Sequence, residues 1–313
     1  MIVHESELFN ASNNLTCPFC NKQLRLFTKT TDKQINLVDD FFYSYECVDC
    51  NILLQYPFWE KAQTSKFYPE NYYAHNNSTK IPRNIRLLNL WLNKKFIYHY
   101  PLRILRLILY PYFEIIKDSK CVLDIGCGKG LFLDLMKSQN KNTYGIEPST
   151  SAQSIAITKG HKIIDYDELT SYDNKFDLIT MFQVAEHLSV KEILNENIFQ
   201  KLNMALSRNG RLIIETPNCD CSIAKKYRQN WRALELPRHL IIFSPKSISK
   251  MLETNGFNVK LFMRISPIDI VQSVKLKYGS KHNKIKMLFE LINLFIHYKS
   301  NASLLTIVAT PKI

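Results

Sequence analysis

The stretch VLDIGCGKGLF, residues 122–132, decides how the rest of this chain is interpreted. An apolar run meets three glycines at alternate positions, Gly126, Gly128 and Gly130, and Asp124 lies two places before the first. A Walker loop needs Gly-Lys-Ser/Thr after four spacer residues from its first glycine, and that pattern is absent. The dinucleotide fingerprint G-x-G-x-x-G would need a third glycine where Leu131 lies. The turn therefore fits neither of these two nucleotide-binding loops.

Strand-like and helix-like patterns alternate from residue 120 onward. Two of the helical patterns begin at Ser/Thr caps and end near glycine, over residues 149–160 and 244–256. Residues 190–206 are amphipathic. This alternation is typical of an α/β fold in which helices cover both faces of a parallel sheet. The predicted strands are KCVLDIG, NTYGIEP, HKIID, KFDLITMFQ, NGRLIIETP, the run ending in NVKLF, and LLTIVATPK.

A carboxylate follows the second of these strands. Glu147 has the chemistry and the place to accept hydrogen bonds from both ribose hydroxyls of an adenosine. Because there is no pyrophosphate to hold, the glycine turn can lie flat against a small ligand. Asp124 can then face a cationic one. Together the two acids point to a nucleoside that carries a positive charge.

Two cysteine pairs, CPFC and CVDC, lie near the N-terminus. Two such knuckles complete a tetrahedral site of four thiolates, which suits zinc, with iron as the main competitor. Redox-active dithiols are the other interpretation, although one pair would be enough for that. Four filled positions leave no open site, so the predicted metal is structural. Its ligands would be Cys17, Cys20, Cys47 and Cys50, in a zinc ribbon over residues 1–60.

The formal charge of +13 is concentrated in residues 81–118 and 264–300. Such a field suits an acidic partner: nucleic acid, anionic lipid or a phosphorylated small molecule. The sequence shows no signal peptide and no apolar run of the roughly 18–20 residues that a membrane-spanning helix needs. We therefore expect a cytoplasmic protein, with peripheral contact at the inner membrane face as an option.

The basic residues also divide the chain. Residues 61–118 combine an aromatic stretch, KFYPENYYAHN, with a basic helical arm, and a core over 119–313 contains a helical insertion at about 264–300. The arm could contact an anionic membrane surface, dock a lipid-linked or nucleotide-linked sugar, or pack on the core with a basic outer face. Tyr68, Tyr72 and Tyr73 could form part of a lid, or could pack between ribbon and core.

The ordered set of motifs resembles the class I S-adenosylmethionine-dependent methyltransferases across residues 119–263. VLDIGCGKG matches their first motif, GIEPS their ribose motif, and FDLITMFQVAEHL the motif after the fourth strand. The resemblance implies a Rossmann-like seven-stranded sheet with helices on both faces and S-adenosylmethionine as cofactor. It implies cofactor contacts from Asp124, Gly126, Cys127 and Gly128 (amino acid end), Glu147 (ribose), Pro148, Asp165 and Tyr166 (adenine), and Gln183 (methyl-donor side).

A finer resemblance concerns QVAEHL and WRALELPRHLIIFSPKSISKMLETNGF. They are similar to a bacterial branch often found among genes for O-antigen, capsule or other surface glycans. That branch frequently carries a zinc ribbon followed by a stretch like FYPENYY. The related sugar C-methyltransferases have a further C-terminal domain that 313 residues do not accommodate, which favours O-methylation over C-methylation and leaves N-methylation open.

Two histidines are candidates for a general base. A sugar hydroxyl is a poor nucleophile, and histidine is the side chain best matched to taking its proton near neutral pH. His239, in PRHL, is the first choice, and His187, in EHL, is the second because it could instead structure the loop beside the cofactor. Glu186 is expected to fix that loop. Arg238 could hold a phosphate or carboxylate of the substrate, or be solvated.

The sequence thus predicts a methyltransferase that acts on a sugar hydroxyl, nucleotide-linked or in a glycan, during surface-polysaccharide biosynthesis. The alternatives are a small-molecule or quinone-type O-methyltransferase, because EHL also occurs there, and a nucleic-acid binder or modifier. The motif of amide methylation, Asn/Asp-Pro-Pro-aromatic, is absent after the fourth strand, which disfavours nucleic acid. An inactive scaffold is disfavoured by the intact Asp124, glycines and Glu147.

Overall fold

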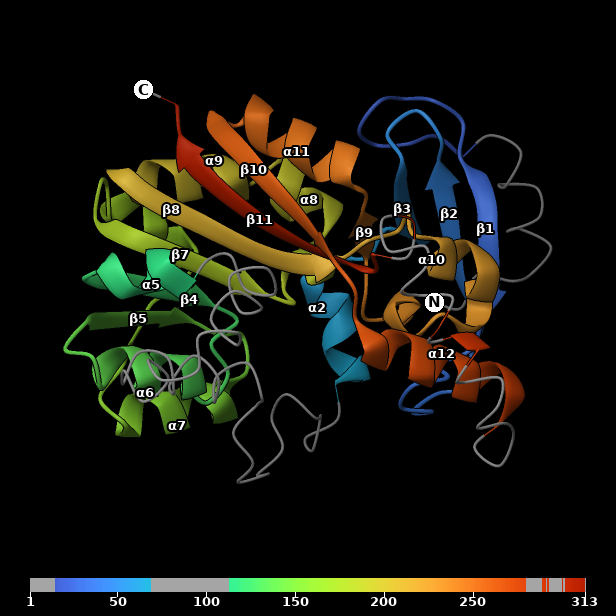
Figure 1. Cartoon of the computed structure of the whole chain (residues 1–313), viewed down its shortest axis with the longest axis horizontal. Helices are drawn as coiled ribbons and strands as arrows, with labels where there is room; N and C mark the ends of the chain where they lie inside the picture. The colour runs from blue at the N-terminus through green and yellow to red at the C-terminus, as the bar shows by residue number, and fades with distance from the viewer. Residues whose placement is uncertain are drawn as a thin grey trace.

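The larger part of the computed structural model is built on a seven-stranded sheet (Figure 1), with strand order β10-β11-β8-β7-β4-β5-β6. The structure describes residues 15–68, 113–279, 289–290, 292, 300 and 302–312. The seven predicted strands are confirmed. They are β4 (Cys121–Ile125), β5 (Asn142–Ile146), β6 (Lys162–Ile163), β7 (Phe176–Phe182), β8 (Leu206–Pro217), β10 (Phe257–Arg264) and β11 (Leu304–Pro311).

The prediction of a parallel sheet is wrong at one edge. β4 to β8 pair in parallel, but β11 lies antiparallel between β8 and β10. Arg264, the last residue of β10, pairs with Leu304, the first residue of β11, so the chain leaves and re-enters the sheet at the same edge. The apolar pattern of a single strand carries no information about its direction, and for this reason the sequence could not predict the reversal.

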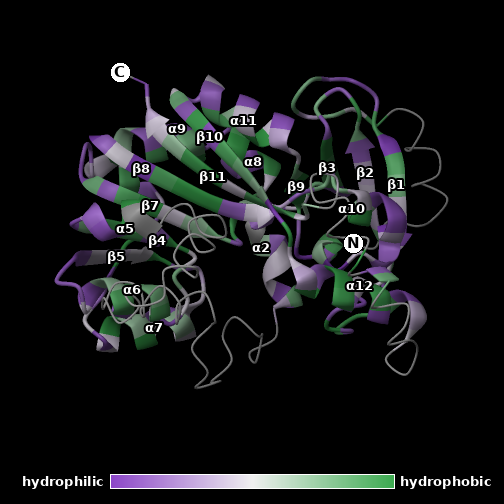
Figure 2. Cartoon of the chain, viewed as in Figure 1, coloured by the Kyte–Doolittle hydropathy of each residue, from purple (hydrophilic) through white to green (hydrophobic). Residues whose placement is uncertain are grey.

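Helices cover both faces of this sheet, as predicted. Figure 1 shows α6 (Leu131–Lys137) and α7 (Thr150–Thr158) on one side and α9 (Ile198–Ala205) and α11 (Pro245–Thr254) on the other. Consecutive residues of each strand point to opposite faces. The strand β4 therefore contributes Val122 to a core with helix α6 and Leu123 to a core with helices α9 and α11. Figure 2 shows the resulting hydrophobic stretches along the strands.

The amphipathic segment 190–206 forms two helices rather than one. A capping box at Ser189 starts α8 (Val190–Leu194), and α9 begins after Asn197, which has a left-handed backbone conformation. Asparagine tolerates that conformation better than most residues, which explains the break.

A second sheet contains the N-terminal cysteine region. Its antiparallel strands are β1 (Arg25–Thr30), β2 (Phe42–Cys47), β3 (Ile52–Tyr56) and β9 (Ile241–Phe243). The strand β9 comes from the C-terminal half of the chain and pairs with β3. Side chains from β1, β2 and β3 share a buried core with α10 (Ser222–Tyr227) and α12 (Pro267–Tyr278). The packing therefore crosses the sequence boundary that we predict at residue 60.

The aromatic stretch and the basic arm lie mostly outside the described residues, and so do Tyr72 and Tyr73. Of residues 61–118, the structure describes α2 (Lys61–Thr64), the 3₁₀ turn Ser65–Phe67, Tyr68 and the end of the segment, with α5 (Phe113–Asp118). The helix α12 begins the predicted insertion at 264–300. None of the described helices combines the length and the apolar character required to span a bilayer.

Candidate active site

The candidate residues lie on loops at one edge of the large sheet. Because β4, β5 and β7 run parallel, their carboxyl ends meet at that edge. The glycine turn follows β4, Glu147 follows β5, and the segment Gln183–His187 follows β7. This arrangement brings together motifs that are far apart in the sequence.

The glycine turn packs closely against the loop after β7. Gly126 has a φ of +71°, and a Cβ placed there would lie 2.5 Å from Cγ2 of Val184. Its amide donates a 2.7 Å hydrogen bond to the carbonyl of Ile146 at the end of β5. Only glycine combines this backbone conformation with such a close approach. The turn therefore lies flat between two strand ends, as expected for a loop that lines a small ligand.

Asp124 is buried at the end of β4, with 5% of its surface exposed. The hydroxyl of Thr180, on the neighbouring strand β7, donates a 2.6 Å hydrogen bond to its carboxylate. Burial, assisted by the negative charge of Glu147, raises the pKa of Asp124 to about 7. A cationic group in front of Asp124 would favour the ionised carboxylate, so the site suits a positively charged ligand.

Glu147 joins the glycine turn to the helix that follows β5. One carboxylate oxygen accepts a 2.9 Å hydrogen bond from the amide of Gly128, and the other accepts 2.8 Å from the amide of Ser149. The side chain is 5% exposed. A carboxylate oxygen can accept more than one hydrogen bond, so this fixed pair of oxygens fits the two hydroxyls of a ribose.

The other predicted cofactor contacts fall around the same edge, and their roles stay predictions. Pro148 and Asp165 are exposed, and Tyr166 is half-buried against the core. Burial raises the pKa of Tyr166, and the charges of Glu192 and Glu147 act in the same direction.

Two further predicted contacts pack against neighbouring strands. Gln183 has a φ of +58° and is held by hydrogen bonds from its backbone and side-chain amides to the carbonyl of Glu215. The sulfur of Cys127 packs where a side chain at Gly145 would lie.

The two candidate bases, His187 and His239, lie edge to face, with ring centroids 4.8 Å apart. Nδ1 of His187 lies 3.0 Å from the carbonyl oxygen of Arg238, and Nδ1 of His239 lies 2.8 Å from that of Ala233. A carbonyl oxygen only accepts hydrogen bonds, so these contacts favour the tautomer with its proton on Nδ1, and at His187 the Tyr68 hydroxyl would share that N–H as a second acceptor. In both neutral rings Nε2 is then the basic nitrogen.

The surroundings of the two rings differ. The side chain of His187 is half-buried, and the Tyr68 hydroxyl lies 2.9 Å from its Nδ1. His239 is 4% exposed, and burial lowers its pKa to about 3. Burial also lowers the pKa of His187, although the charge of Glu235 opposes this. His187 is therefore the ring that an acceptor can reach more easily.

Glu186 is fully buried behind these rings. Thr216 donates a 2.9 Å hydrogen bond to one carboxyl oxygen, and the other has no partner among the described residues. The backbone carbonyl of Glu186 accepts from the amide of Leu240. Burial raises its pKa to about 8, which favours the neutral carboxylic acid near pH 7. These contacts fit the predicted role of fixing the loop.

Arg238 does not have the surroundings predicted for it. Its guanidinium is fully buried and makes a two-pronged ion pair with Asp32, at 2.6 and 3.0 Å. Its Nε lies 3.3 Å from a carboxylate oxygen of Glu235. Both the solvated arginine and the substrate-binding arginine are therefore wrong, because the guanidinium is enclosed by two acids of the chain itself.

The sequence did not single out Asp32 or Glu235, and it left Tyr68 either in a lid or in the packing between ribbon and core. Glu235 lies four residues before His239, a spacing that could have drawn attention to it. Asp32 carries no such signal, because it lies in a polar loop between β1 and β2.

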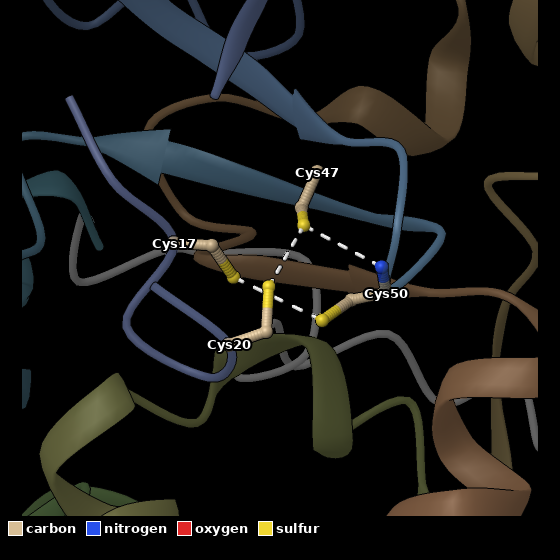
Figure 3. A group of neighbouring side chains, drawn as sticks. All are labelled: Cys17, Cys20, Cys47 and Cys50. Carbon is tan, nitrogen blue, oxygen red and sulfur yellow. Dashed lines mark hydrogen bonds between the residues drawn. The ribbon is translucent and has the colours of Figure 1, made fainter. Parts of the chain in front are cut away.

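The four N-terminal cysteines point toward one another (Figure 3). The sulfurs of Cys17 and Cys50 lie 4.0 Å apart and those of Cys20 and Cys47 3.5 Å apart. Four thiolates at about 2.3 Å from a tetrahedral zinc ion are about 3.8 Å from each other, so the cluster fits such an ion. The amide of Cys50 lies 3.4 Å from the sulfur of Cys47, as in a metal-binding knuckle.

Comparisons with known proteins extend this picture. An uncharacterized protein of Methanocaldococcus jannaschii is 26% identical over 58% of this chain and 78% of its own length. A ubiquinone biosynthesis O-methyltransferase of Glaesserella parasuis is 29% identical over 48% of this chain and 61% of its own. That of Bradyrhizobium diazoefficiens is 28% identical over 37% of this chain and 43% of its own. The chain thus spans about half the length of these two enzymes.

A solved structure, of an S-adenosylmethionine-dependent methyltransferase from Archaeoglobus fulgidus, is similar with a TM-score of 0.47 and 19% identity, over 71% of this chain and 98% of that one. The family described as "Methyltransferase domain" matches residues 96–261. That match spans the glycine turn, Glu147 and the segment after β7, and it covers more than half of the chain. The chain therefore belongs to the methyltransferase domain family, that is, to the S-adenosylmethionine-dependent methyltransferases.

Proposed function

We propose that this methyltransferase transfers the methyl group of S-adenosylmethionine to the oxygen of a sugar hydroxyl. The observation that carries this proposal is the pair of histidines beside the predicted cofactor site, whose Nδ1 atoms both lie within hydrogen-bond distance of a backbone carbonyl oxygen, the arrangement that leaves Nε2 as the basic nitrogen. A base of this kind is needed for an acceptor whose hydroxyl does not ionise near pH 7.

Four residues would hold the cofactor. Asp124 would face its positive charge, Glu147 its ribose, and Gly126 and Gly128 would line its methionine end. Bound there, S-adenosylmethionine supplies a methyl group on a sulfonium leaving group. The burial of Asp124 and Glu147 excludes water and strengthens their interaction with a cationic ligand.

His187 is the residue that we assign as the proton acceptor. Transfer would form a bond between the acceptor oxygen and the methyl carbon and would leave the carbon–sulfur electron pair on sulfur. The hydroxyl proton moves to Nε2 of His187. The ring then carries a positive charge, which Glu235 stabilises, since its negative charge already favours protonation of His187. His239, behind it, holds the ring edge to face.

The acceptor is proposed to be a small molecule or glycan with negative charge, such as a nucleotide-linked sugar of a surface-polysaccharide pathway. The formal charge of +13 supports an anionic acceptor, or peripheral contact with an anionic membrane that presents it. A second candidate, a phenolic hydroxyl of a quinone precursor, is favoured by the names of two relatives.

The cysteine cluster is proposed to hold a structural zinc ion. The sulfur spacing and the burial of Cys17 and Cys47 support it. Four cysteine ligands leave no coordination position for a substrate, so the ion would stabilise the N-terminal sheet rather than take part in methyl transfer.

The test is a mass-spectrometric screen of nucleotide-linked sugars and of phenols with S-adenosylmethionine, in which a product gains one methyl group. With the acceptor found, His187→Gln is expected to lower kcat by about 100-fold or more, the usual contribution of a general base. The affinity for S-adenosylmethionine should stay within about twofold. Methylation of phenols alone would replace the sugar assignment, and full activity of His187→Gln would remove the assigned base.

A further inference from the structure

We propose that Asp32 and Arg238 are positioning residues for methyl transfer: the N-terminal loop carrying Asp32 sets the orientation and tautomer of the active-site histidines. The inference rests on the proposed function, because it concerns the histidines to which that function assigns the proton. It links a loop of the cysteine-bearing sheet to the chemistry at the edge of the large sheet.

The first step is the contact between the two residues. Asp32 and Arg238 are both 0% exposed, and 206 positions separate them. Each carboxylate oxygen of Asp32 accepts a hydrogen bond from a guanidinium nitrogen of Arg238. Each also accepts one from a backbone amide, that of Ile35 or of Leu37. Burial alone would raise the pKa of Asp32, but the hydrogen bonds and charge of Arg238 hold it below its ordinary value. The two side chains therefore form an ion pair, and the guanidinium of Arg238 is held in one orientation.

The second step runs from Arg238 to His187 through the backbone. The carbonyl oxygen of Arg238 lies 3.0 Å from Nδ1 of His187 and, because it can only accept, favours a proton there; the Tyr68 hydroxyl lies 2.9 Å from the same nitrogen and can accept from it as well. The amide of Arg238 donates to the carbonyl of Glu235, 3.0 Å away. With its guanidinium held by Asp32 and its amide held by Glu235, Arg238 has little freedom to rotate its carbonyl away from His187.

The third step runs through the side chain of Glu235. One of its oxygens lies 3.3 Å from Nε of Arg238, and the other lies 4.0 Å from Nε2 of His239. Arg238 thus shares its charge between Asp32 and Glu235. Without the Asp32 charge, the guanidinium would pair more fully with Glu235 and draw that carboxylate away from the histidines.

The geometry predicts a specific effect for a conservative change. Asp32→Asn keeps the size of the side chain but removes the charge that orients the guanidinium. We expect the Arg238 carbonyl to rotate and His187 to change from the Nδ1–H tautomer to a mixture with the Nε2–H form, which cannot accept a proton at Nε2. If Asp32 only supported the fold, Asp32→Asn would lower the stability of the protein without changing the tautomer of His187.

The experiment measures the tautomers directly. Protein labelled with ¹⁵N on histidine side chains is compared by NMR, and the signals are assigned with His187→Gln and His239→Gln. In the unchanged chain both rings should show the Nδ1–H pattern at pH 7. Asp32→Asn should shift His187 toward a mixed pattern and lower kcat at least tenfold, with the affinity for S-adenosylmethionine within twofold.

Two controls complete the design. Asp32→Glu retains the charge and should show most of the Nδ1–H signal that His187 gives in the unchanged chain. Asp39→Asn removes an exposed carboxylate from the same loop and should leave tautomer and kcat unchanged.

An unchanged His187 tautomer in folded Asp32→Asn overturns the inference. If Asp32→Asn does not fold, Arg238→Lys replaces it, because lysine keeps the charge but cannot make the two-pronged pair. The same tautomer shift is expected there, and its absence is equally decisive. The NMR measurement needs no acceptor, so the failure to find a methylated product would count against the proposed function alone.

Discussion

Burial moves three ionisable residues of the site toward their uncharged forms. It raises the pKa of Asp124 to about 7 and that of Glu186 to about 8, and it lowers that of His239 to about 3. Near neutral pH the ligand-free site therefore carries less charge than its composition indicates. A charged ligand that enters it has to change these protonation states, which makes binding sensitive to pH.

The first prediction concerns Asp124. The ionised carboxylate binds a cation best, and below pH 7 the protein must release a proton to provide it. The affinity for S-adenosylmethionine should therefore fall as pH decreases from 7 to 5.5, by at most about tenfold per unit. Isothermal titration calorimetry at several pH values measures this. Asp124→Asn should bind more weakly at pH 7 and lose the dependence, and a constant affinity in the unchanged chain would contradict the prediction.

The second prediction concerns the pH profile of methyl transfer. His187 must be neutral to take a proton, and its pKa is lowered from 6.5 chiefly by burial. The acid limb of kcat/KM should therefore lie below pH 6.5, because a lower pKa keeps the base neutral further into the acid range. The rate is measured with S-adenosylmethionine saturating at each pH. An acid limb above pH 6.5 would point to a different base.

The third prediction compares two glycines that both have a positive φ but differ in the space around them. Gly126 and Gly279 have φ values of +71° and +81°, but only Gly126 has Val184 in the path of a Cβ. Gly279→Ala should lower the free energy of unfolding by about 1–3 kcal/mol, because the ψ of Gly279 is 161° and this combination of φ and ψ is open essentially to glycine alone. Gly126→Ala should lower it further and weaken S-adenosylmethionine binding at least tenfold. If the two variants had equal effects on thermal unfolding and on S-adenosylmethionine binding, the close approach of Gly126 to Val184 would be unimportant.

Among elements, the cysteine knuckles give the fourth prediction. Elemental mass spectrometry of the purified protein should find one zinc ion per chain. Cys47→Ser should lose the zinc and lower the unfolding temperature, because a structural zinc ion contributes folding free energy. Cys121→Ser, which alters a buried thiol of β4 outside the cluster, should retain the metal. Equal zinc content in both variants would exclude the cluster as the metal site.

The elements also show which parts of the fold could be predicted. The strands of the large sheet are apolar runs bounded by turns, so their positions follow from local sequence. The direction of β11 and the pairing of β9 depend on distant partners, which no local pattern records. The break between α8 and α9 depends on the single residue Asn197, whereas the amphipathic pattern continues across it.

At the scale of the molecule, the same distinction separates the two halves of the site. The predicted cofactor residues follow strand ends, so spacing and chemistry were enough to predict that Asp124 and Glu147 lie at the same edge of the sheet. The partner of Arg238 lies in a loop 206 residues away, and its carboxylate resembles any other surface acid in the sequence. Only the packing of the two sheets shows that Asp32 is buried and paired.

The pairing of β9 with β3 also determines when the N-terminal sheet can be completed. Leu54 pairs with Ile241, so the ribosome has to add nearly 190 residues after β3 before its partner strand exists. At about 5–20 residues per second this takes roughly 10–40 s. Throughout that interval β3 has an open edge, the kind of backbone surface at which neighbouring chains aggregate. Until its second half is made, a nascent chain of this protein therefore exposes that strand edge to any other chain nearby.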